Sequence, residues 1–422
     1  MTLSVAVVGG GWAGCAAALT LAEAGVKVSL HEASRTLGGR ARAVELGSHL
    51  LDNGQHILLG AYAQSLQLIE RLSPATSDGL WRLPLAIEQP PDFSLVCPRL
   101  PAPLHLLAGL LAARGLSWRD KLAAARWAHA VLNRDEPPDH SSVSQLTRNQ
   151  PEKLNRLLWH PLCVSALNTP PDIASARVFR DVIRAAFGGC NHHSDLLLPR
   201  RDLTSLFPAP AAARVLELGG EVRLSSRVTR LDATVDAITL DTRDESVTYS
   251  HVILAVAPQH LSALTNQVAA LETLSDEVGR YDYQAIATAY VQYDPTFRLP
   301  KPLFALDNGP AQFVFDRGQS HGQAGLLAFV ASTATNLPEN WLDQAEAQLQ
   351  RIAHPGPVLW RKRIVEKQAT YACVPGMRRP AVRTAHPRIF LAGDYTASPY
   401  PATLESATLS GVQSARALLE KP

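Results

Sequence analysis

The chain has 422 residues, of which 40 are Lys or Arg and 38 are Asp or Glu, so its formal net charge is +2. Apolar and aromatic residues make up 46% of the sequence, which suffices for a large core and excludes a disordered chain. Because no basic excess is present, we expect no nucleic-acid partner.

Five cysteines are spread singly along the chain, which predicts neither a disulfide framework nor a zinc module and favours a reducing compartment. His192 and His193 have no well-spaced acid or thiol partners, so we expect no metal site. The N-terminus has no charged region before its apolar start, and no apolar run approaches the roughly 20 residues of a spanning helix. We therefore expect neither a signal peptide nor a transmembrane helix.

The first forty residues predict a nucleotide-binding unit. Residues 3–8 form an apolar run suited to a buried strand, residues 15–23 favour a helix, and residues 26–31 predict a second strand. Between them, Gly9 permits a tight turn, Gly11 lets the backbone approach a pyrophosphate, and Gly14 lets the helix pack closely on the strand. The helix N-terminus offers free N–H groups to phosphates.

The acid and the basic residues that follow specify this site further. Glu32 ends the second strand, where it is placed to accept hydrogen bonds from a ribose diol and to repel the 2′-phosphate of NADP. Gly38 and Gly39 follow, and because they have no side chains, a ligand can approach their backbone closely. Arg40 and Arg42 supply forked cationic donors suited to phosphate, although a solvated loop remains an alternative for Arg42.

Later segments predict further strands and helices. Alternating apolar residues over 222–240 and 247–256 predict several antiparallel strands. Residues 281–293 and 326–332 predict strands of a sheet that walls a cavity, and residues 342–352 predict a helix. Residues 387–392 predict a short strand that leads into Gly393-Asp394, and a final helix opens near residue 402.

Five segments together resemble one family, the squalene-associated FAD-dependent desaturase-like proteins of the amine oxidase and phytoene desaturase superfamily. The matching segments are VAVVGGGWAG (5–14), EASRTLGGRAR (32–42), LDNGQHILLGAY (51–62), LPAPLHLLAGLL with RGLSWRDK (100–121), and FLAGDYTASPYPATLESATLSG (390–411). Two blocks outside the nucleotide motifs, DNGQHILLGAY and RGLSWRDK, discriminate best, because many flavoproteins share the nucleotide motifs.

The resemblance implies an α/β fold, with a Rossmann-like FAD-binding domain of the glutathione-reductase or amine-oxidase type and an inserted α+β substrate domain. We expect residues 1–70, 205–265 and 385–422 to form the discontinuous FAD-binding domain. Residues 71–204 and 266–384 are expected to form the substrate-binding domain. The expected FAD-binding residues are Gly9, Gly11, Trp12, Ala13, Gly14, Glu32, Ala33, Gly39, Arg40, Gly54, Gln55, Val228, Gly393, Asp394, Thr403 and Leu404.

FAD is expected to be bound non-covalently, because nothing specific marks a covalent attachment; Cys373 is the one thiol to check. Members of the family act as hydroxysqualene dehydroxylases in bacterial squalene and hopanoid synthesis. The resemblance thus implies that reduced FAD delivers hydride to hydroxysqualene, a C30 isoprenoid, with loss of water. No second glycine-rich unit is present, so the electron donor that reduces FAD is expected to be an unidentified partner.

The segment from Asp52 to His56 lies where related enzymes run past the flavin ring. His56 is a candidate proton donor because imidazole titrates near neutral pH. Asp52 is the second candidate, either orienting His56 or acting itself if its pKa is raised. Structural roles remain open for both residues, Asp52 as the cap of a turn and His56 as a hydrogen-bond partner of the backbone.

Residues 99–134 carry six basic residues against one acid, among leucines and tryptophans. This composition predicts a surface anchor that binds the cytoplasmic face of the inner membrane, which would make the protein cytoplasmic and peripheral. A core helix with a solvated basic face is the alternative. For the activity, the alternatives are a carotenoid or phytoene-type desaturase, another amine-oxidase-like flavin oxidase, or a non-catalytic FAD-containing lipid carrier.

Overall fold

Five parallel strands from three separate stretches of the chain form a central sheet. The computed structural model describes residues 3–47, 49–72, 79–133, 136–306 and 309–420. The sheet has the order β10-β2-β1-β14-β20. Its strands are β1 (Ser4–Val8), β2 (Lys27–His31), β10 (Glu221–Arg223), β14 (His251–Leu254) and β20 (Ile389–Leu391). β1, β14 and β20 are mostly apolar and buried, as a sheet covered on both faces requires.

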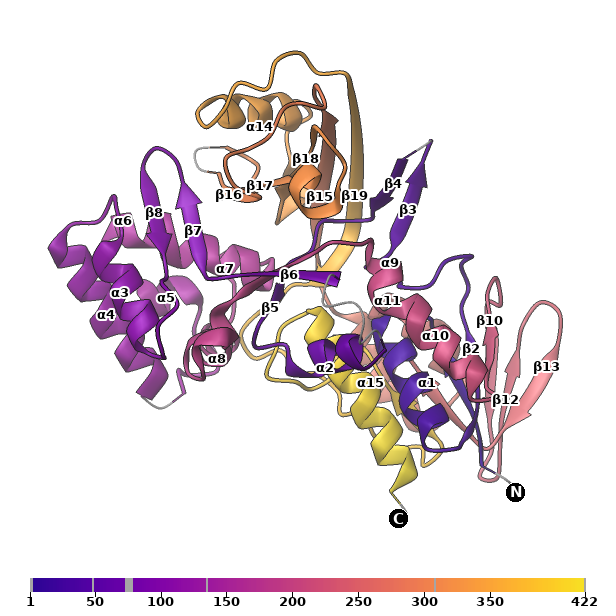
Figure 1. The fold of residues 1–422 in the computed structure, drawn as a ribbon. Coiled ribbons are helices and arrows are strands. Elements are labelled where there is room, and N and C mark those ends of the chain that lie inside the picture. Colours follow the sequence, from indigo (N-terminus) through magenta and orange to yellow (C-terminus); the bar gives the residue numbers. More distant parts are fainter. Residues whose placement is uncertain (1–2, 48, 73–78, 134–135, 307–308, 421–422) are drawn as a thin grey trace.

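The N-terminal and C-terminal helices of this region pack side by side (Figure 1). These are α1 (Trp12–Glu23) and α15 (Leu404–Leu419). A Cβ at Gly411 would lie 2.2 Å from the Ala13 carbonyl oxygen, so the two helices approach closely only because position 411 has no side chain. The neighbouring helices are α2 (Ala63–Leu72), α9 (Leu203–Leu206) and α10 (Pro208–Glu217).

The antiparallel meander is shorter than the sequence predicts. It consists of β11 (Arg230–Ala233), β12 (Ile238–Asp241) and β13 (Ser246–Tyr249). The two ends of the predicted run, β10 and β14, instead join the parallel sheet, so the prediction that they belong to the meander was wrong. Val252 and Ile253 are fully buried, and such a continuous apolar run is typical of a central parallel strand.

A second sheet of five antiparallel strands has the order β16-β17-β18-β15-β19. Its strands are β15 (Tyr283–Gln292), β16 (Leu303–Ala305), β17 (Phe313–Asp316), β18 (Leu326–Ala331) and β19 (Trp360–Tyr371). Helix α14 (Trp341–Gln350) covers one face, where its apolar residues cluster with Ala287, Ala289 and Val291 of β15. The predicted strands over 281–293 and 326–332 and the helix over 342–352 are thereby confirmed.

Most of the remaining helices gather on one side of the molecule (Figure 1). They are α3 (Leu104–Ala112), α4 (Trp118–Asn133), α5 (Val143–Thr147), α6 (Glu152–Leu154), the π-helical turn η2 (Asn155–Trp159), α7 (His160–Leu167), α8 (Ala176–Phe187) and the short turn η3 (Asn191–Ser194). Elsewhere lie α11 (Pro258–Thr265), η4 (Ala269–Leu271), α12 (Glu272–Gly279), α13 (Arg317–His321) and η5 (Ala334–Asn336).

Three small sheets connect these parts: β3 (Ala43–Leu46) with β4 (His49–Asp52); β5 (Leu58–Leu59) with β9 (Leu196–Pro199) and β6 (Leu80–Leu83); and β7 (Ala86–Gln89) with β8 (Phe93–Val96). Among the helices in the described ranges, none combines the length and apolar character needed to cross a membrane.

Candidate active site

Glycines fix the turn between β1 and α1. Gly9 has a φ of +111°, and a Cβ at this position would lie 2.5 Å from the Ala255 carbonyl oxygen. A Cβ at Gly14 would lie 1.8 Å from the Gly9 carbonyl oxygen. A larger residue at either position would therefore collide with backbone. The turn brings Gly9, Gly11, Trp12 and Ala13 to the wall of a large cavity, and Gly14 supports them from behind.

The N-terminus of α1 is left open for a ligand. Gly11 precedes the helix without a side-chain cap, and the first turn contains no acidic residue. The first N–H groups of a helix have no partner within the helix and carry a partial positive charge. These groups are therefore available to an anionic ligand such as a phosphate.

The carboxylate of Glu32 is held at the end of β2. Its Oε2 accepts a hydrogen bond from the Gly10 N–H at 2.6 Å, and its Oε1 accepts one from the Ser34 N–H at 2.7 Å. Glu32 and Ala33 both line the cavity. The remaining lone pairs of the carboxylate face the space where ribose hydroxyls would lie.

The second glycine pair packs against the first. Gly38 donates its N–H to the Gly10 carbonyl at 2.8 Å, and a Cβ at Gly39 would lie 3.2 Å from the Gly11 Cα. Gly39 also has a φ of +61°. These contacts keep the two glycine segments close together at the cavity wall next to α1.

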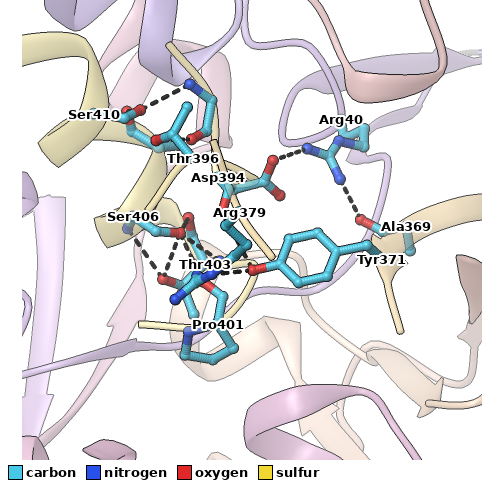
Figure 2. A network of polar contacts seen from close by, with 12 residues as sticks. Arg40, Ala369, Tyr371, Arg379, Asp394, Thr396, Pro401, Thr403, Ser406 and Ser410 are labelled. Atoms are coloured by element: carbon cyan, nitrogen blue, oxygen red, sulfur yellow. Dashed lines mark hydrogen bonds and ion pairs between the residues drawn. The ribbon is translucent and has the colours of Figure 1, made fainter. Parts of the chain in front are cut away.

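Arg40 links this loop to the C-terminal motif (Figure 2). Its guanidinium donates to the Asp394 carboxylate at 2.7 Å and to the Ala369 carbonyl at 2.7 Å. Burial alone would lower the pKa of Arg40, but the Asp394 carboxylate, with smaller contributions from Glu366 and Tyr283, outweighs burial and raises it. Arg40 therefore stays cationic at the cavity wall. Arg42 also lines the cavity and donates to the Gly39 carbonyl at 2.6 Å.

The N-terminus of α15 faces the same cavity. The Thr403 hydroxyl accepts from the Ser406 N–H at 3.1 Å, and the Ser406 hydroxyl accepts from the Thr403 N–H at 3.0 Å, which forms a capping box (Figure 2). Gly393 donates its N–H to the Ser410 hydroxyl at 2.8 Å. Gly393, Asp394, Thr403 and Leu404 all line the cavity, as does Val228 from the segment between β10 and β11.

The cavity continues from these motifs into the region between the helices and the second sheet. Its volume is about 2060 Å³, which exceeds the roughly 300–1,000 Å³ of a typical single-ligand pocket. Apolar side chains form much of the wall away from the glycine motifs, including Ile183, Phe187, Ile286, Leu303, Phe313 and Phe315. The space therefore suits a dinucleotide and a long apolar molecule together.

Asp52 is placed behind this cavity rather than at its surface. It is 1% exposed, its Oδ2 lies 3.0 Å from Nη1 of the equally buried Arg317, and its Oδ1 accepts from the Leu203 N–H at 2.9 Å. Burial raises the pKa of Asp52, whereas Arg317 and the Leu203 N–H act to lower it. The direct catalytic role predicted for Asp52 does not fit this position, because both oxygens are engaged in holding the loop.

Gly54, Gln55 and His56 do line the cavity. The Nδ1 of His56 lies 2.8 Å from the Gly54 carbonyl oxygen. A carbonyl only accepts hydrogen bonds, so Nδ1 carries the proton and Nε2 is left with a lone pair. Burial lowers the pKa of His56, although the Gly54 carbonyl and Asp52 partly oppose this.

Sequence reasoning missed two residues at this loop. Arg317 also donates to the Gln55 side-chain oxygen at 2.9 Å, and so joins α13 to the segment that carries His56. Glu366 of β19 lines the cavity and accepts from the Asn53 side-chain N–H at 3.1 Å. No local pattern marks either residue, since each meets its partner through contacts distant in sequence.

None of the five cysteines, all within the described residues, lines the cavity. Cys373 is buried and donates its N–H to the Thr169 hydroxyl at 3.0 Å. Across the described parts of the chain, no group of three or more His, Cys, Asp or Glu side chains is arranged to hold a metal ion.

The cavity's motifs fit FAD. The uncapped N-terminus of α1 and the close glycine backbones would hold the pyrophosphate. Glu32 would bind a ribose. Arg40 and Asp394 would bind the chain that leads to the flavin. The N-terminus of α15 would then face the flavin edge on which negative charge builds during reduction.

Comparisons with known proteins agree with this site. The sequence profile of a family described as flavin containing amine oxidoreductase matches residues 12–419. A protein named hydroxysqualene dehydroxylase from Sinorhizobium fredii is 27% identical, over 98% of this chain and 98% of that protein. One of the same name from Rhodopseudomonas palustris is also 27% identical, over 99% of both. A 15-cis-phytoene desaturase from an Oncidium hybrid is 25% identical over 99% of this chain and 78% of that protein.

Solved structures share the fold. An oxidoreductase from Methanosarcina mazei superposes with a TM-score of 0.74 at 15% identity, covering 98% of this chain and 100% of that one. A triple mutant of putrescine oxidase superposes with a TM-score of 0.75 at 18% identity, covering 99% of both chains.

Proposed function

Because this chain belongs to the flavin-containing amine oxidoreductase family and is an FAD-dependent oxidoreductase, we propose that it reduces hydroxysqualene to squalene with loss of water. The observation that carries this proposal is one continuous cavity of about 2060 Å³, which joins the FAD motifs to apolar walls. The similarity of nearly the whole chain to two proteins named hydroxysqualene dehydroxylase supports the same substrate. The reaction would serve bacterial squalene or hopanoid synthesis.

The substrate's chemistry suits such a cavity. Its hydroxyl is allylic, so protonation of the oxygen and departure of water leave a delocalised cation. Bound FAD in its reduced form supplies the hydride that quenches this cation. Ile286, Phe313 and Phe315 line the cavity with apolar side chains, which exclude the water that would otherwise recapture the cation.

His56 is our candidate for contact with the substrate hydroxyl. With its lowered pKa, the ring is mostly neutral at pH 7, and Nε2 then accepts a hydrogen bond that orients the hydroxyl. Donation of a proton from Nε2 requires the imidazolium form. We therefore expect the rate of dehydroxylation to rise as the pH falls from 7 toward the pKa of His56, and this rise to be absent in H56Q.

We also propose that the protein binds the cytoplasmic face of the inner membrane through α3 and α4. Leu104, Leu107 and Leu111 of α3 are 46–53% exposed, and Trp118 and Leu122 at the start of α4 are 71% and 51% exposed. Exposed basic residues stand beside them: Arg99, Arg114, Arg119 and Arg126. Arg134, also in the predicted segment, lies outside the described residues. Apolar side chains with basic neighbours favour an anionic lipid surface, at roughly 1 kcal/mol for each basic residue near it.

Vesicle flotation tests the membrane proposal. The holoprotein should float with vesicles that contain anionic lipid, and the L107Q/W118A double variant should float several-fold less while keeping its FAD. Equal recovery of both proteins in the sedimented fraction would contradict the proposal.

Anaerobic turnover tests the proposed reaction. Chemically reduced holoenzyme should convert hydroxysqualene to squalene while its flavin becomes oxidised. Reduced flavin that persists with no squalene formed would refute the dehydroxylase function.

The similarity to phytoene desaturases favours one second candidate, a desaturase that transfers hydride from an isoprenoid to oxidised FAD. Bleaching of the oxidised flavin by phytoene under anaerobic conditions would support it. An FAD-containing lipid carrier would bind these isoprenoids without a redox change in either direction.

A further inference from the structure

We propose that the Glu366 carboxylate forms a cation-binding subsite in the cavity, suited to an allylic carbocation or an ammonium group on long apolar chains. The inference rests on the proposed function for its role in catalysis. Its binding prediction, however, is independent of turnover.

Glu366 lies on the face of the second sheet that looks into the cavity. Its cross-strand neighbour Ile286 also lines the cavity, on the face opposite to α14. Asn53 donates its side-chain N–H both to Glu366 Oε2 at 3.1 Å and to the Arg40 carbonyl at 3.1 Å. Because Asn53 precedes Gly54, Glu366 is held beside the loop that carries His56.

Two hydrogen bonds hold the Glu366 side chain in place. Oε2 accepts from Asn53, and Oε1 accepts from the Gln368 N–H at 3.4 Å. Both partners are neutral N–H donors, so neither brings a positive charge to Glu366.

The other carboxylates at the cavity wall either pair with a cation or belong to segments other than the His56 loop and its neighbours. Glu32 is bound by two backbone N–H groups, Asp394 is paired with Arg40, and Glu88 is paired with Lys301. Glu152 is exposed at the start of α6. Among the described cavity residues, Glu366 is thus the acid that lies beside the His56 loop and makes no ion pair.

The local charge balance is negative. Arg40 makes its ion pair with Asp394 and donates to the Ala369 carbonyl, and it forms no ion pair with Glu366. Arg40, Asp394 and Glu366 together therefore carry one unit of negative charge. In a cavity with apolar walls, this charge attracts a cation more strongly than it would in water.

The electrostatic role fits the proposed step. A proton moves to the hydroxyl oxygen, the C–O bond breaks with its electron pair leaving on water, and the allylic cation remains until hydride forms the new C–H bond. Glu366 makes and breaks no bond. It lowers the energy of the cationic state while that state exists.

A matched pair of ligands tests the subsite on the oxidised holoenzyme. The first is a dimethylammonium ion with two C15 isoprenoid chains, whose permanent charge also prevents amine oxidation. The second is the hydrocarbon with a dimethyl-substituted carbon in place of nitrogen. Binding is followed by the change in the flavin absorbance spectrum.

The E366Q variant keeps a hydrogen-bond acceptor but loses the charge, so it should bind the ammonium ligand about 10- to 100-fold more weakly and the hydrocarbon with an affinity changed less than about 3-fold. E366D should retain most of the ammonium affinity. E217Q, which removes the charge of an exposed carboxylate outside the cavity, is the control and should leave both affinities unchanged. Equal ammonium binding by E366Q and wild type, or an equal loss for both ligands, would overturn the subsite.

Turnover separates this inference from the proposed function. If wild type makes squalene and E366Q, with normal FAD content, makes it about 100-fold more slowly, the catalytic role is supported. If both make squalene equally fast, that role fails while the proposed function stands. If wild type makes none but discriminates between the ligands through Glu366, the proposed function fails and the subsite stands.

Discussion

The FAD cradle (residues 9–14, 32–40 and 393–404) and the catalytic corner (residues 52–56 with Arg317 and Glu366) are held together by different contacts. In the cradle, glycine backbones pack on each other and two side-chain contacts add to them: the Gly38 N–H bonds the Gly10 carbonyl, Gly14 packs on Gly9, Glu32 bonds the Gly10 N–H, and Arg40 pairs with Asp394. In the corner, side chains from distant segments meet, as where Tyr290 donates its hydroxyl to the Asp52 carbonyl at 2.8 Å. Cofactor retention and substrate chemistry are therefore separable by mutation.

Loss of FAD should be the largest effect. In G14V, the new side chain meets the Gly9 carbonyl oxygen, so the turn cannot close and the flavin content of the purified protein should fall at least about 10-fold. A Cβ at Gly279 would meet no neighbouring atom within 4 Å, and the φ of Gly279 is not positive, so G279A is the matched control. Normal flavin content in G14V would contradict the description of the cradle.

Breaking the buried ion pair between Asp52 and Arg317 should have the next largest effect, a loss of stability. R317M leaves Asp52 charged without its partner and should lower the free energy of unfolding by about 3–5 kcal/mol, measured by urea denaturation of the holoprotein. The D52N/R317M double variant should lose less than the sum of the two single variants. At the exposed pair of Arg214 with Glu217, R214A should stay within about 0.5 kcal/mol of wild type.

A buried histidine at the end of β2, next to the cradle, should also make stability depend on pH. Burial, reinforced by Arg223, lowers the pKa of His31 to about 4. The unfolded chain then binds a proton at higher pH than the folded chain, so stability falls as the pH drops from about 6.5 to 4, by about 3 kcal/mol in total. His321, with a pKa lowered to about 3, adds to the same trend.

The H31Q variant isolates the contribution of His31. Denaturation at pH 7 and at pH 4 should show a smaller loss of stability in H31Q than in wild type. The same loss in both proteins would show that His31 is readily protonated in the folded state.

The smallest effect should come from the cap of α15. T403A removes the hydroxyl that accepts from the Ser406 N–H and should cost about 1 kcal/mol of stability with FAD still bound. T403S retains the hydroxyl and should match wild type. A loss of FAD in T403A would mean that the cap also fixes the cofactor.

The difference between the two regions explains which site residues could be predicted from the sequence. The glycine turns and Glu32 were predictable because strand, turn, helix and acid follow one another within about thirty residues. Glu366 was not, because it meets Asn53 across 313 positions, and Arg317 meets Asp52 across 265. Asp52 was expected near the flavin because the resemblance places residues 52–56 there, but its side chain is buried and pairs with Arg317. The limits of the meander depended likewise on which strands are buried on both faces.

The proposed function requires that hydride moves from reduced FAD to the isoprenoid. A single anaerobic turnover in D₂O tests it most directly, because the flavin hydrogen that is transferred exchanges with solvent. We expect one squalene carrying one carbon-bound deuterium for each flavin oxidised. Squalene without deuterium, or flavin that stays reduced in the presence of hydroxysqualene, would contradict it.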